Sequence, residues 1–167
     1  KLRCYRFEKD EVVRNFIGEK KEEYPFLDLD HPITVGSYMN EPDIINNRYQ
    51  LHLAMEETRE LLPKLFAEYA KISGRSYGKV EGVGCQDPET VLFLLGSSYD
   101  TSIEVIEKMR AEGRKVGAAT LHVLRPFPAK EISTYLEKAK RIMVADRQDS
   151  YGAGGGNLSL EVRAAMQ

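Results

Sequence analysis

The sequence predicts an α/β fold in which helices cover both faces of a mainly parallel sheet. Apolar runs at residues 91–95, 116–124 and 142–145 have the composition of strands that are buried on both faces. Segments 101–111 and 129–138, which lie between them, carry apolar residues at helical spacing. Strands that alternate with helices form parallel βαβ units, so these five segments predict one parallel sheet.

Local signals predict where the remaining elements begin and end. Ser98 or Asp100 is expected to cap the helix that follows the first core strand, and Gly113 is expected to end it. A further short strand is expected at residues 80–84, and a last helix at residues 158–166.

A long amphipathic helix is expected ahead of the sheet, capped by Asn46-Asn47 and ending at Ser73, just before a glycine. Pro63 lies inside it, which predicts a kink or two abutting helices. We expect the apolar face of this helix to pack on the sheet, and the alternative is a coiled-coil partner face. Residues at steps of three and four form that face: Leu51, Met55, Thr58, Leu62, Leu65, Tyr69 and Ile72.

Residues 1–42 are predicted to form an irregular arm, and residues 43–167 the α/β domain. A short strand is expected at residues 4–7 and one or two helical turns at residues 11–16, after which prolines interrupt any regular element. Because such a long irregular stretch is uncommon inside a compact domain, we expect the arm to cross a neighbouring domain or subunit. Both ends of the chain look cut, so a piece of a longer polypeptide is expected.

Composition argues against two classes of partner. The net charge is −2 and the isoelectric point is near 6.0, so neither nucleic acid nor an anionic membrane is expected to bind. The sequence has no run of about 18 apolar residues, so no membrane span is expected.

The only two cysteines, Cys4 and Cys85, favour a reducing compartment, and a cytoplasmic location is expected. Cys85 is interpreted as a small loop residue rather than a reactive thiol.

Three segments follow the core strands at the carboxyl edge of the expected sheet: residues 96–100, 122–128 and 146–157. Ligands of open parallel sheets bind at that edge. The first segment is interpreted as a plain turn into a helix rather than a phosphate cradle, because it lacks the spacing of a dinucleotide fingerprint and the lysine of a P-loop.

Arg125 is the residue of the second segment with the clearest functional signal. Prolines on its carboxyl side stiffen the loop, so its guanidinium is aimed at a fixed partner, which suits a carboxylate or a phosphate. A structural or interface pair is favoured over a ligand, with Asp146 or Asp149 as the acidic partner.

The third segment contains a glycine loop that reads Gly-Ala-Gly-Gly-Gly-Asn from Gly152. The third glycine of a dinucleotide fingerprint is therefore missing, and interface packing is favoured over cofactor contact or a merely flexible loop. The residues expected at an interface are Arg125, Pro126, Phe127, Asp146, Arg147, Gly152 and Gly154.

Signals for catalysis are missing from the sequence. His31, His52 and His122 have no metal-ligand spacing and are interpreted as packed or exposed side chains. There is no nucleophile elbow and no recognisable pair of acid and base carboxylates. No catalytic, cofactor-binding or metal-binding residue is therefore predicted in this chain.

Six segments taken together resemble domain II of the alpha subunit in the pyruvate:ferredoxin oxidoreductase family, that is, the 2-oxoacid:ferredoxin oxidoreductases. The likeness covers roughly residues 43–166, and the Arg-Pro-Phe-Pro loop and the Asp-Arg strand end are its most specific parts. The segments read Ser-Gly-Arg-Ser-Tyr at 73–77, Gly-Cys-Gln-Asp-Pro-Glu at 84–89, the strand and turn at 91–97, Gly-Arg-Lys-Val-Gly at 113–117, Leu-Arg-Pro-Phe-Pro at 124–128, and Ile-Met-Val-Ala-Asp-Arg at 142–147.

The resemblance implies a three-layer α/β/α sandwich like the carboxyl-terminal domain of transketolase. It also implies a parent enzyme that decarboxylates pyruvate, oxalate or a related 2-oxoacid on thiamine diphosphate and magnesium, and passes electrons through iron–sulfur clusters to ferredoxin. Pyruvate-type members of the family transfer the acyl group to coenzyme A. The expected partners are ferredoxin and the other domains or subunits of that enzyme.

The sequence departs from a whole enzyme of this kind in ways that matter. It contains no Gly-Asp-Gly thiamine–metal motif and no set of cluster-binding cysteines. The resemblance therefore implies a non-catalytic assembly domain, and it transfers no active-site residue to a position in this chain. The alternative is a freestanding regulatory module that binds a nucleotide or coenzyme A.

Overall fold

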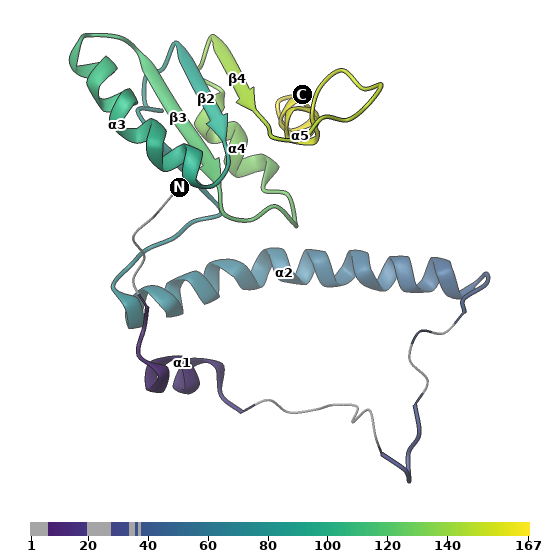
Figure 1. Cartoon of the computed structure of the whole chain (residues 1–167). Helices are drawn as coiled ribbons and strands as arrows, with labels where there is room; N and C mark the ends of the chain where they lie inside the picture. Colours follow the sequence, from purple (N-terminus) through teal and green to yellow (C-terminus); the bar gives the residue numbers. More distant parts are fainter. Residues whose placement is uncertain (1–6, 20–27, 34–35, 37) are drawn as a thin grey trace.

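A computed structural model describes residues 7–19, 28–33, 36 and 38–167 of the chain. Five helices and four strands occur in that part (Figure 1). In chain order they are α1 (Asp10–Ile17), α2 (Asp43–Ser73), β1 (Val80–Val83), β2 (Thr90–Leu94), α3 (Ser97–Ala111), β3 (Val116–Leu121), α4 (Ala129–Leu136), β4 (Arg141–Ala145) and α5 (Asn157–Ala165).

The four strands form one sheet in the order β1-β3-β2-β4. The three predicted core strands lie side by side in parallel, with Val91 opposite Gly117 of β3 and opposite Ile142 of β4. The short strand β1 is also present, and it pairs antiparallel with β3 at the edge. The prediction of a mainly parallel sheet is therefore confirmed.

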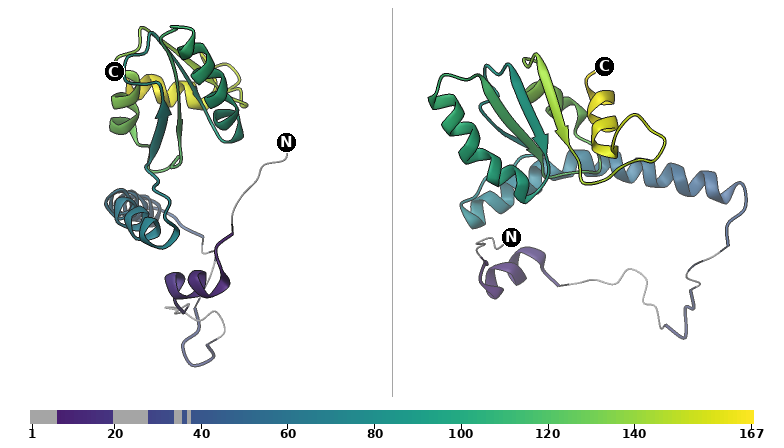
Figure 2. Two further views of the ribbon diagram at one scale, coloured as in Figure 1. Left: turned by 90° about the vertical axis from the view of Figure 1, so that its left-hand side faces the viewer. Right: turned by 45° about the horizontal axis from the view of Figure 1, so that its top comes forward.

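Helices cover both faces of this sheet, which gives the expected three layers (Figure 2). On one face, α3 packs through Tyr99 and Ile106 against Leu94 and Ala118. On the other face, α4 and α5 share a larger core with the strands. The residues of that core are Val80, Val91, Phe93, Ala119, Leu121, Ile132, Leu136, Leu158 and Val162. The α/β fold class is confirmed.

Two predicted boundaries were wrong for identifiable reasons. Helix α3 begins at Ser97 with Gly96 as its N-cap residue, so neither Ser98 nor Asp100 caps it, and Asp100 lies in its first turn. Strand β3 ends at Leu121 rather than residue 124, because its ladder with β1 ends at the pair of Val80 and Leu121.

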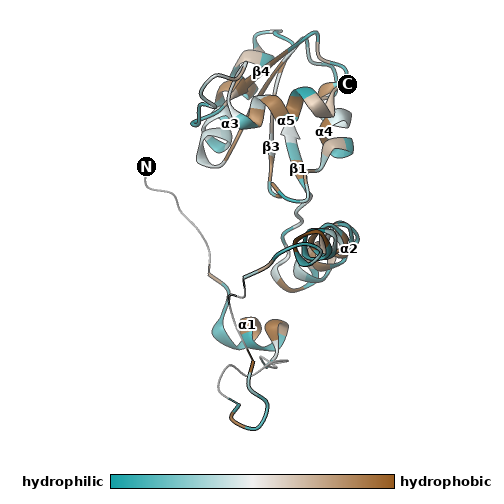
Figure 3. Cartoon of the chain, turned by 90° about the vertical axis from the view of Figure 1, so that its right-hand side faces the viewer, coloured by the Kyte–Doolittle hydropathy of each residue, from teal (hydrophilic) through white to brown (hydrophobic). Residues whose placement is uncertain are grey.

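Helix α2 does not pack on the sheet, which corrects the expectation for its apolar face. Of its 31 residues, only Ser73 is buried. The reason is that α3, α4 and α5 already occupy both faces, so α2 lies beside the sheet domain (Figures 1 and 3). A hydrogen bond from Arg59 Nη1 to the Phe127 carbonyl oxygen (3.1 Å) connects it to the loop before α4.

The start and the interior of α2 also differ from expectation. The helix begins at Asp43, with Pro42 as its N-cap residue, so the predicted cap at Asn46-Asn47 was wrong. An acidic residue in the first turn suits the positive end of the helix dipole. The helix continues through Pro63 without interruption, so it is not two abutting helices. Gly74 in the left-handed region ends it, as predicted.

The arm contains the predicted helical turns, as helix α1. Its Phe16 ring contacts Tyr69 of α2 edge-on, with ring centroids 6.3 Å apart. Glu8 just before it accepts a hydrogen bond from Arg75 at 2.6 Å. The expected strand at residues 4–7 falls outside the described residues except for Phe7. That the arm crosses a neighbouring domain stays a prediction.

Gly84 is predicted to be sensitive to substitution, because it lies where β1 comes closest to the start of β3. Its φ is +68°, and a Cβ atom added there would lie 2.6 Å from the Val116 carbonyl oxygen. We expect Gly84→Ala to lower the free energy of unfolding by roughly 2 kcal/mol or more. Urea unfolding measures this, with Gly113→Ala as the control, because Gly113 has a φ of +85° but open space around its Cβ position. Equal losses for the two variants would contradict the role of close approach.

Candidate interface at the carboxyl edge of the sheet

Arg125 ties the loop between β3 and α4 to helix α5. Its guanidinium forms an ion pair with Glu161 of α5, and it also donates a hydrogen bond to the Leu124 carbonyl oxygen at 2.8 Å. The same guanidinium lies 5.8 Å from the centre of the Phe127 ring. The expectation that Asp146 or Asp149 pairs with Arg125 was therefore wrong. Sequence spacing gave no signal for Glu161, because 36 residues separate the two partners.

Asp146 holds the beginning of α5. One carboxylate oxygen accepts the Leu158 N–H at 2.9 Å, and the other accepts the Gln148 N–H at 3.1 Å. The Leu158 hydrogen bond and then the Gln148 hydrogen bond hold the pKa of the Asp146 carboxyl below its ordinary value. No residue at the start of α5 itself supplies a side-chain cap. Asp146 at the end of β4 therefore does the work of a cap for that helix.

The glycine loop closes tightly at one end and is open at the other. A Cβ atom at Gly156 would lie 2.3 Å from the Gln148 carbonyl oxygen and 2.8 Å from the Asp146 carboxylate, so only glycine fits there. Gly152, with a φ of +81°, and Gly154 are both exposed. Arg147 is exposed too, and within the described part of the chain it has no ion pair.

Seven residues were predicted to form an interface, and the structure places them in different surroundings. Arg125 and Asp146 both contact α5, while Pro126 is buried and holds the loop from within. Phe127 packs partly against the core, and its carbonyl oxygen bonds α2. The exposed members are the ones able to meet another surface: Arg125, Asp146, Arg147, Gly152 and Gly154.

A small crevice lies between the carboxyl ends of β2 and β4. It is lined by Leu94, Leu95, Ser98, Ala145, Asp146 and Arg147, with a volume of about 150 Å³. The chain leaves β2 toward α3 on one face and leaves β4 toward α5 on the other, so this is the topological switch point of the sheet. The crevice is well below the roughly 300–1,000 Å³ of pockets that enclose cofactors or drug-sized ligands.

A polar cluster that the sequence did not reveal lies near the β1 edge. His122 Nε2 lies 2.9 Å from one Glu81 carboxylate oxygen, and the Tyr99 hydroxyl lies 3.5 Å from the other. Burial raises the pKa of the Tyr99 hydroxyl, and the neighbouring Glu81 carboxylate raises it further. The Tyr77 ring packs edge-on against His122. His122 is therefore an exposed histidine that pairs with Glu81 of the antiparallel edge strand.

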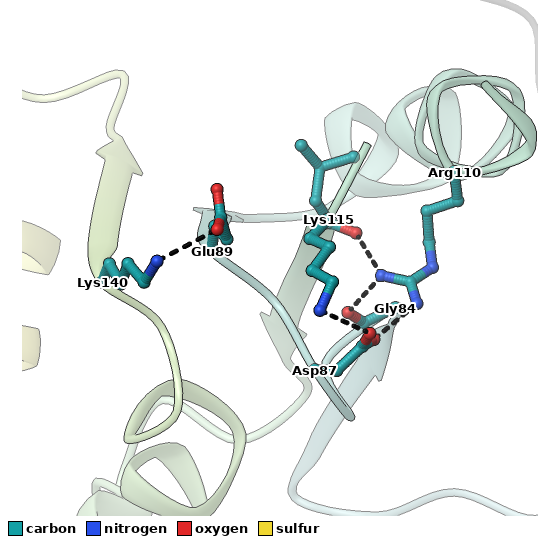
Figure 4. Close-up of polar contacts among 7 residues, drawn as sticks. Gly84, Asp87, Glu89, Arg110, Lys115 and Lys140 are labelled. Atoms are coloured by element: carbon teal, nitrogen blue, oxygen red, sulfur yellow. Dashed lines mark hydrogen bonds and ion pairs between the residues drawn. The ribbon is translucent and has the colours of Figure 1, made fainter. Parts of the chain in front are cut away.

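The opposite, amino edge of the sheet is held by ion pairs (Figure 4). Arg110 of α3 donates to the Gly84 and Val116 carbonyl oxygens at 3.2 and 3.1 Å and pairs with Asp87 at 2.6 Å. The Arg110 hydrogen bond keeps the pKa of the Asp87 carboxyl below its ordinary value. Lys140 pairs with Glu89 at 3.0 Å across the starts of β4 and β2. These contacts are exposed or partly buried, and they hold the starts of the strands together.

Cys85 has the environment of a packed residue. Its Sγ lies 3.4 Å from the Ala118 carbonyl oxygen, and it packs against the larger core. Burial raises the pKa of the thiol to about 11, although the charge of Arg110 opposes this. Little thiolate is present near neutral pH, which agrees with the interpretation of Cys85 as a small loop residue.

Many of the exposed large apolar side chains belong to α2 and α1. In the amino-terminal half of α2 they spread over a broad part of the helix surface, while Asn46, Asn47 and Gln50 occupy the remaining side. An exposed apolar surface of this breadth is normally covered by protein. The residues and their exposed fractions are Ile44 (45%), Ile45 (58%), Tyr49 (61%), Leu51 (51%) and Leu53 (43%).

The described residues form neither a cluster of metal ligands nor a membrane-spanning helix. Within them, no group of three or more His, Cys, Asp or Glu side chains gathers closely enough to hold a metal ion. No helix in that same part of the chain is long and apolar enough to cross a membrane.

Asp146→Asn is predicted to weaken the domain in a pH-dependent way. Asparagine loses the charge and one of the two acceptor oxygens at the start of α5. Because the folded-state pKa of Asp146 lies below its ordinary value of 3.8, its contribution is complete above that value and is lost as the pH falls through the folded pKa. The wild type should therefore melt at a higher temperature than the variant at pH 7, with a difference that shrinks below about pH 4.

The matched control for this comparison is Asp149→Asn in the same loop, where the described residues give the carboxylate no hydrogen bond. A melting difference between wild type and Asp146→Asn that does not change between pH 3 and pH 7 would contradict the charged hydrogen bonds.

The pair of Arg125 and Glu161 is predicted to contribute modestly to stability. Their side chains are 55% and 34% exposed, so solvent screens the attraction. A double-mutant cycle with Arg125→Ala and Glu161→Gln should give a coupling free energy of about 0.2–1 kcal/mol by urea unfolding. A coupling indistinguishable from zero would show that the two side chains do not stabilise each other.

Comparison with known proteins identifies similar chains. Residues 88–167 match the family model described as pyruvate:ferredoxin oxidoreductase core domain II. The chain is 36% identical over 147 residues to pyruvate synthase subunit PorA of Thermotoga maritima, which covers 88% of the chain and 38% of that protein. It is 34% identical over 146 residues to ketoisovalerate oxidoreductase subunit VorA of Pyrococcus horikoshii, which covers 87% of the chain and 37% of that protein.

One solved structure is also similar, at a low level. It is a 2-oxoglutarate:ferredoxin oxidoreductase from Magnetococcus marinus with 2-oxoglutarate, coenzyme A and succinyl-CoA bound, at 22% identity and a TM-score of 0.45. The match covers 65% of this chain and 18% of that one.

The chain spans about two fifths of the length of these curated relatives. The family match covers the segment from the start of β2 through α5, which includes the Arg125 loop and Asp146. The chain is thus a relative of the pyruvate:ferredoxin oxidoreductases, and its residues 88–167 correspond to core domain II of that family.

Proposed function

We propose that this chain is a non-catalytic assembly domain of a thiamine-diphosphate-dependent 2-oxoacid:ferredoxin oxidoreductase. The parent enzyme would decarboxylate pyruvate or a related 2-oxoacid and pass the electrons to ferredoxin. The observation that supports this most directly is the exposed apolar surface of α2, because such a surface in a domain of this family needs another part of the enzyme to cover it.

The described residues do not fit the cofactors of such an enzyme. They contain no cluster of metal-ligating side chains, and an iron–sulfur cluster needs about four cysteine ligands. The chain has only two cysteines, of which Cys85 is packed into the core as a neutral thiol. Thiamine diphosphate, magnesium and the clusters are therefore assigned to other domains or subunits, and no chemical step is assigned to this chain.

In this proposal, the chain holds in place the surfaces that contact other domains or subunits of the enzyme. Asp146 and Arg125 tie the loops at the carboxyl edge to α5, so the exposed Arg147 and the open end of the glycine loop are held in place. Helix α2 and the arm provide the apolar surface. The partners are the other domains or subunits of the same enzyme.

The alternative of a freestanding nucleotide or coenzyme A module is less well supported. It would leave the amino-terminal half of α2 in water, and the crevice at the switch point, with about 150 Å³, is too small to enclose such a ligand. No additional observation favours it.

Leu53→Asp in the full-length subunit tests this proposal. A charge placed on a covered apolar surface is costly, so the dissociation constant of the assembled enzyme should rise about 100-fold or more. Analytical ultracentrifugation and thiamine retention measure the effect, with Lys64→Asp on an exposed part of the same helix as the control. Arg125→Ala should weaken assembly less, because the ion pair of Arg125 with Glu161 is partly exposed to solvent. Normal assembly and thiamine retention in Leu53→Asp would refute the proposal.

A further inference from the structure

A buried hydroxyl group on β3 has no hydrogen-bond partner in the described part of the chain. Thr120 is only 3% exposed, and its Oγ1 atom reaches no donor or acceptor among the described residues. Polar atoms that are buried in folded proteins almost always have a partner, because folding takes away their hydrogen bonds to water. A buried hydroxyl without a protein partner therefore indicates that another group completes the site, and ordered water molecules commonly fill this role.

Thr120 lies near the carboxyl end of β3, on the face of the sheet that α3 covers. Side chains alternate along a strand, so Thr120 shares this face with Ala118, which packs against α3, and with His122 just past the strand. Glu81 of β1 is the direct antiparallel partner of Thr120, so the two side chains point to the same face with Cβ atoms roughly 5 Å apart. The Tyr99 hydroxyl of α3 approaches the same Glu81 carboxylate. Four polar side chains therefore gather between β1, β3 and the start of α3.

The contact between Tyr99 and Glu81 is long for a hydrogen bond. The two oxygens lie 3.5 Å apart, whereas O–H···O hydrogen bonds are about 2.5–3.0 Å long. Tyr99 is 4% exposed, and burial raises the pKa of its hydroxyl, so the group keeps its proton and is a donor near neutral pH. The other Glu81 carboxylate oxygen lies 2.9 Å from His122 Nε2. A weakly bound donor and an unpaired hydroxyl, both buried, therefore lie beside one carboxylate.

We propose that one ordered water molecule is bound between Thr120, Tyr99 and Glu81. The water accepts hydrogen bonds from the two hydroxyls and donates one to the carboxylate, which gives the three or so bonds that buried waters typically make. A cation is a poorer occupant, because Ca²⁺ and Mg²⁺ require about six oxygen ligands, more than these side chains supply. The water connects the edge strand β1, the inner strand β3 and the first turn of α3. This inference does not rest on the proposed function.

A crystal structure of the full-length subunit, at a resolution that shows ordered waters, tests this inference directly. We expect density for a single water oxygen within about 3.2 Å of both Thr120 Oγ1 and the Tyr99 hydroxyl oxygen. Well-ordered side chains with no water between them would overturn the inference. A Thr120 hydroxyl that donates to a protein oxygen instead would also overturn it, because the site would then need no further group.

Thr120→Val in the full-length subunit provides a second measurement, because valine has nearly the shape of threonine but no hydroxyl. If the water is bound, the substitution removes one of its partners, so the melting temperature should fall by about 2 °C or more. If the hydroxyl is truly unpaired, valine removes a costly buried group, and a melting temperature equal to or above that of the wild type would overturn the inference.

The matched control is Thr134→Val on α4. Thr134 is exposed, and its hydroxyl donates to the Lys130 carbonyl oxygen at 3.1 Å, so this substitution should shift the melting temperature by about 1 °C at most. Neither measurement depends on α2 or on subunit association, so a failure here is distinguishable from a failure of the proposed assembly role.

Discussion

The whole sheet domain depends on β2 being buried on both of its faces. Val91 and Phe93 have no exposed surface, and they point into the core of α4 and α5, while Leu94 points into the core of α3. The neighbours β3 and β4 each pair with β2 over its length. A strand in this position admits no polar residue on either face, so it forces helices onto both sides of the sheet and thereby sets the three layers.

A consequence of this arrangement is that polar residues gather at the two edges where the strands end. At the amino edge they form ion pairs that bridge neighbouring strands, as between Lys140 and Glu89. At the carboxyl edge they organise α5 through Asp146 and Arg125. Neither edge of the described structure contains a nucleophile placed beside a base. In the described structure these polar residues hold loops and helices in place.

The sequence was sufficient for the fold and insufficient for the side-chain partners. Apolar runs such as residues 91–95 have few alternatives to a buried strand, so the parallel sheet and its helices were predictable. The partner of Arg125 was not, because Glu161 is brought to it only by the packing of α5, and nothing in the local sequence distinguishes Glu161 from other acidic residues. Local rules also misplaced the start of α2, since Asn46 and Asn47 have the residue type of a cap but lie inside the helix. For α2, sequence alone did not show that helices already cover both faces of the sheet.

The length of α2 gives the chain a mechanical property of its own. The helix has 31 residues and so extends about 46 Å, and its contacts with the sheet domain lie in its carboxyl-terminal half, at Arg59 and beyond. The first residue of α2 lies about 24 Å from Arg59, so a pivot of about 5° at those contacts displaces it by roughly 2 Å. A contact that fixed the start of α2 would therefore constrain the tilt of the sheet domain relative to it.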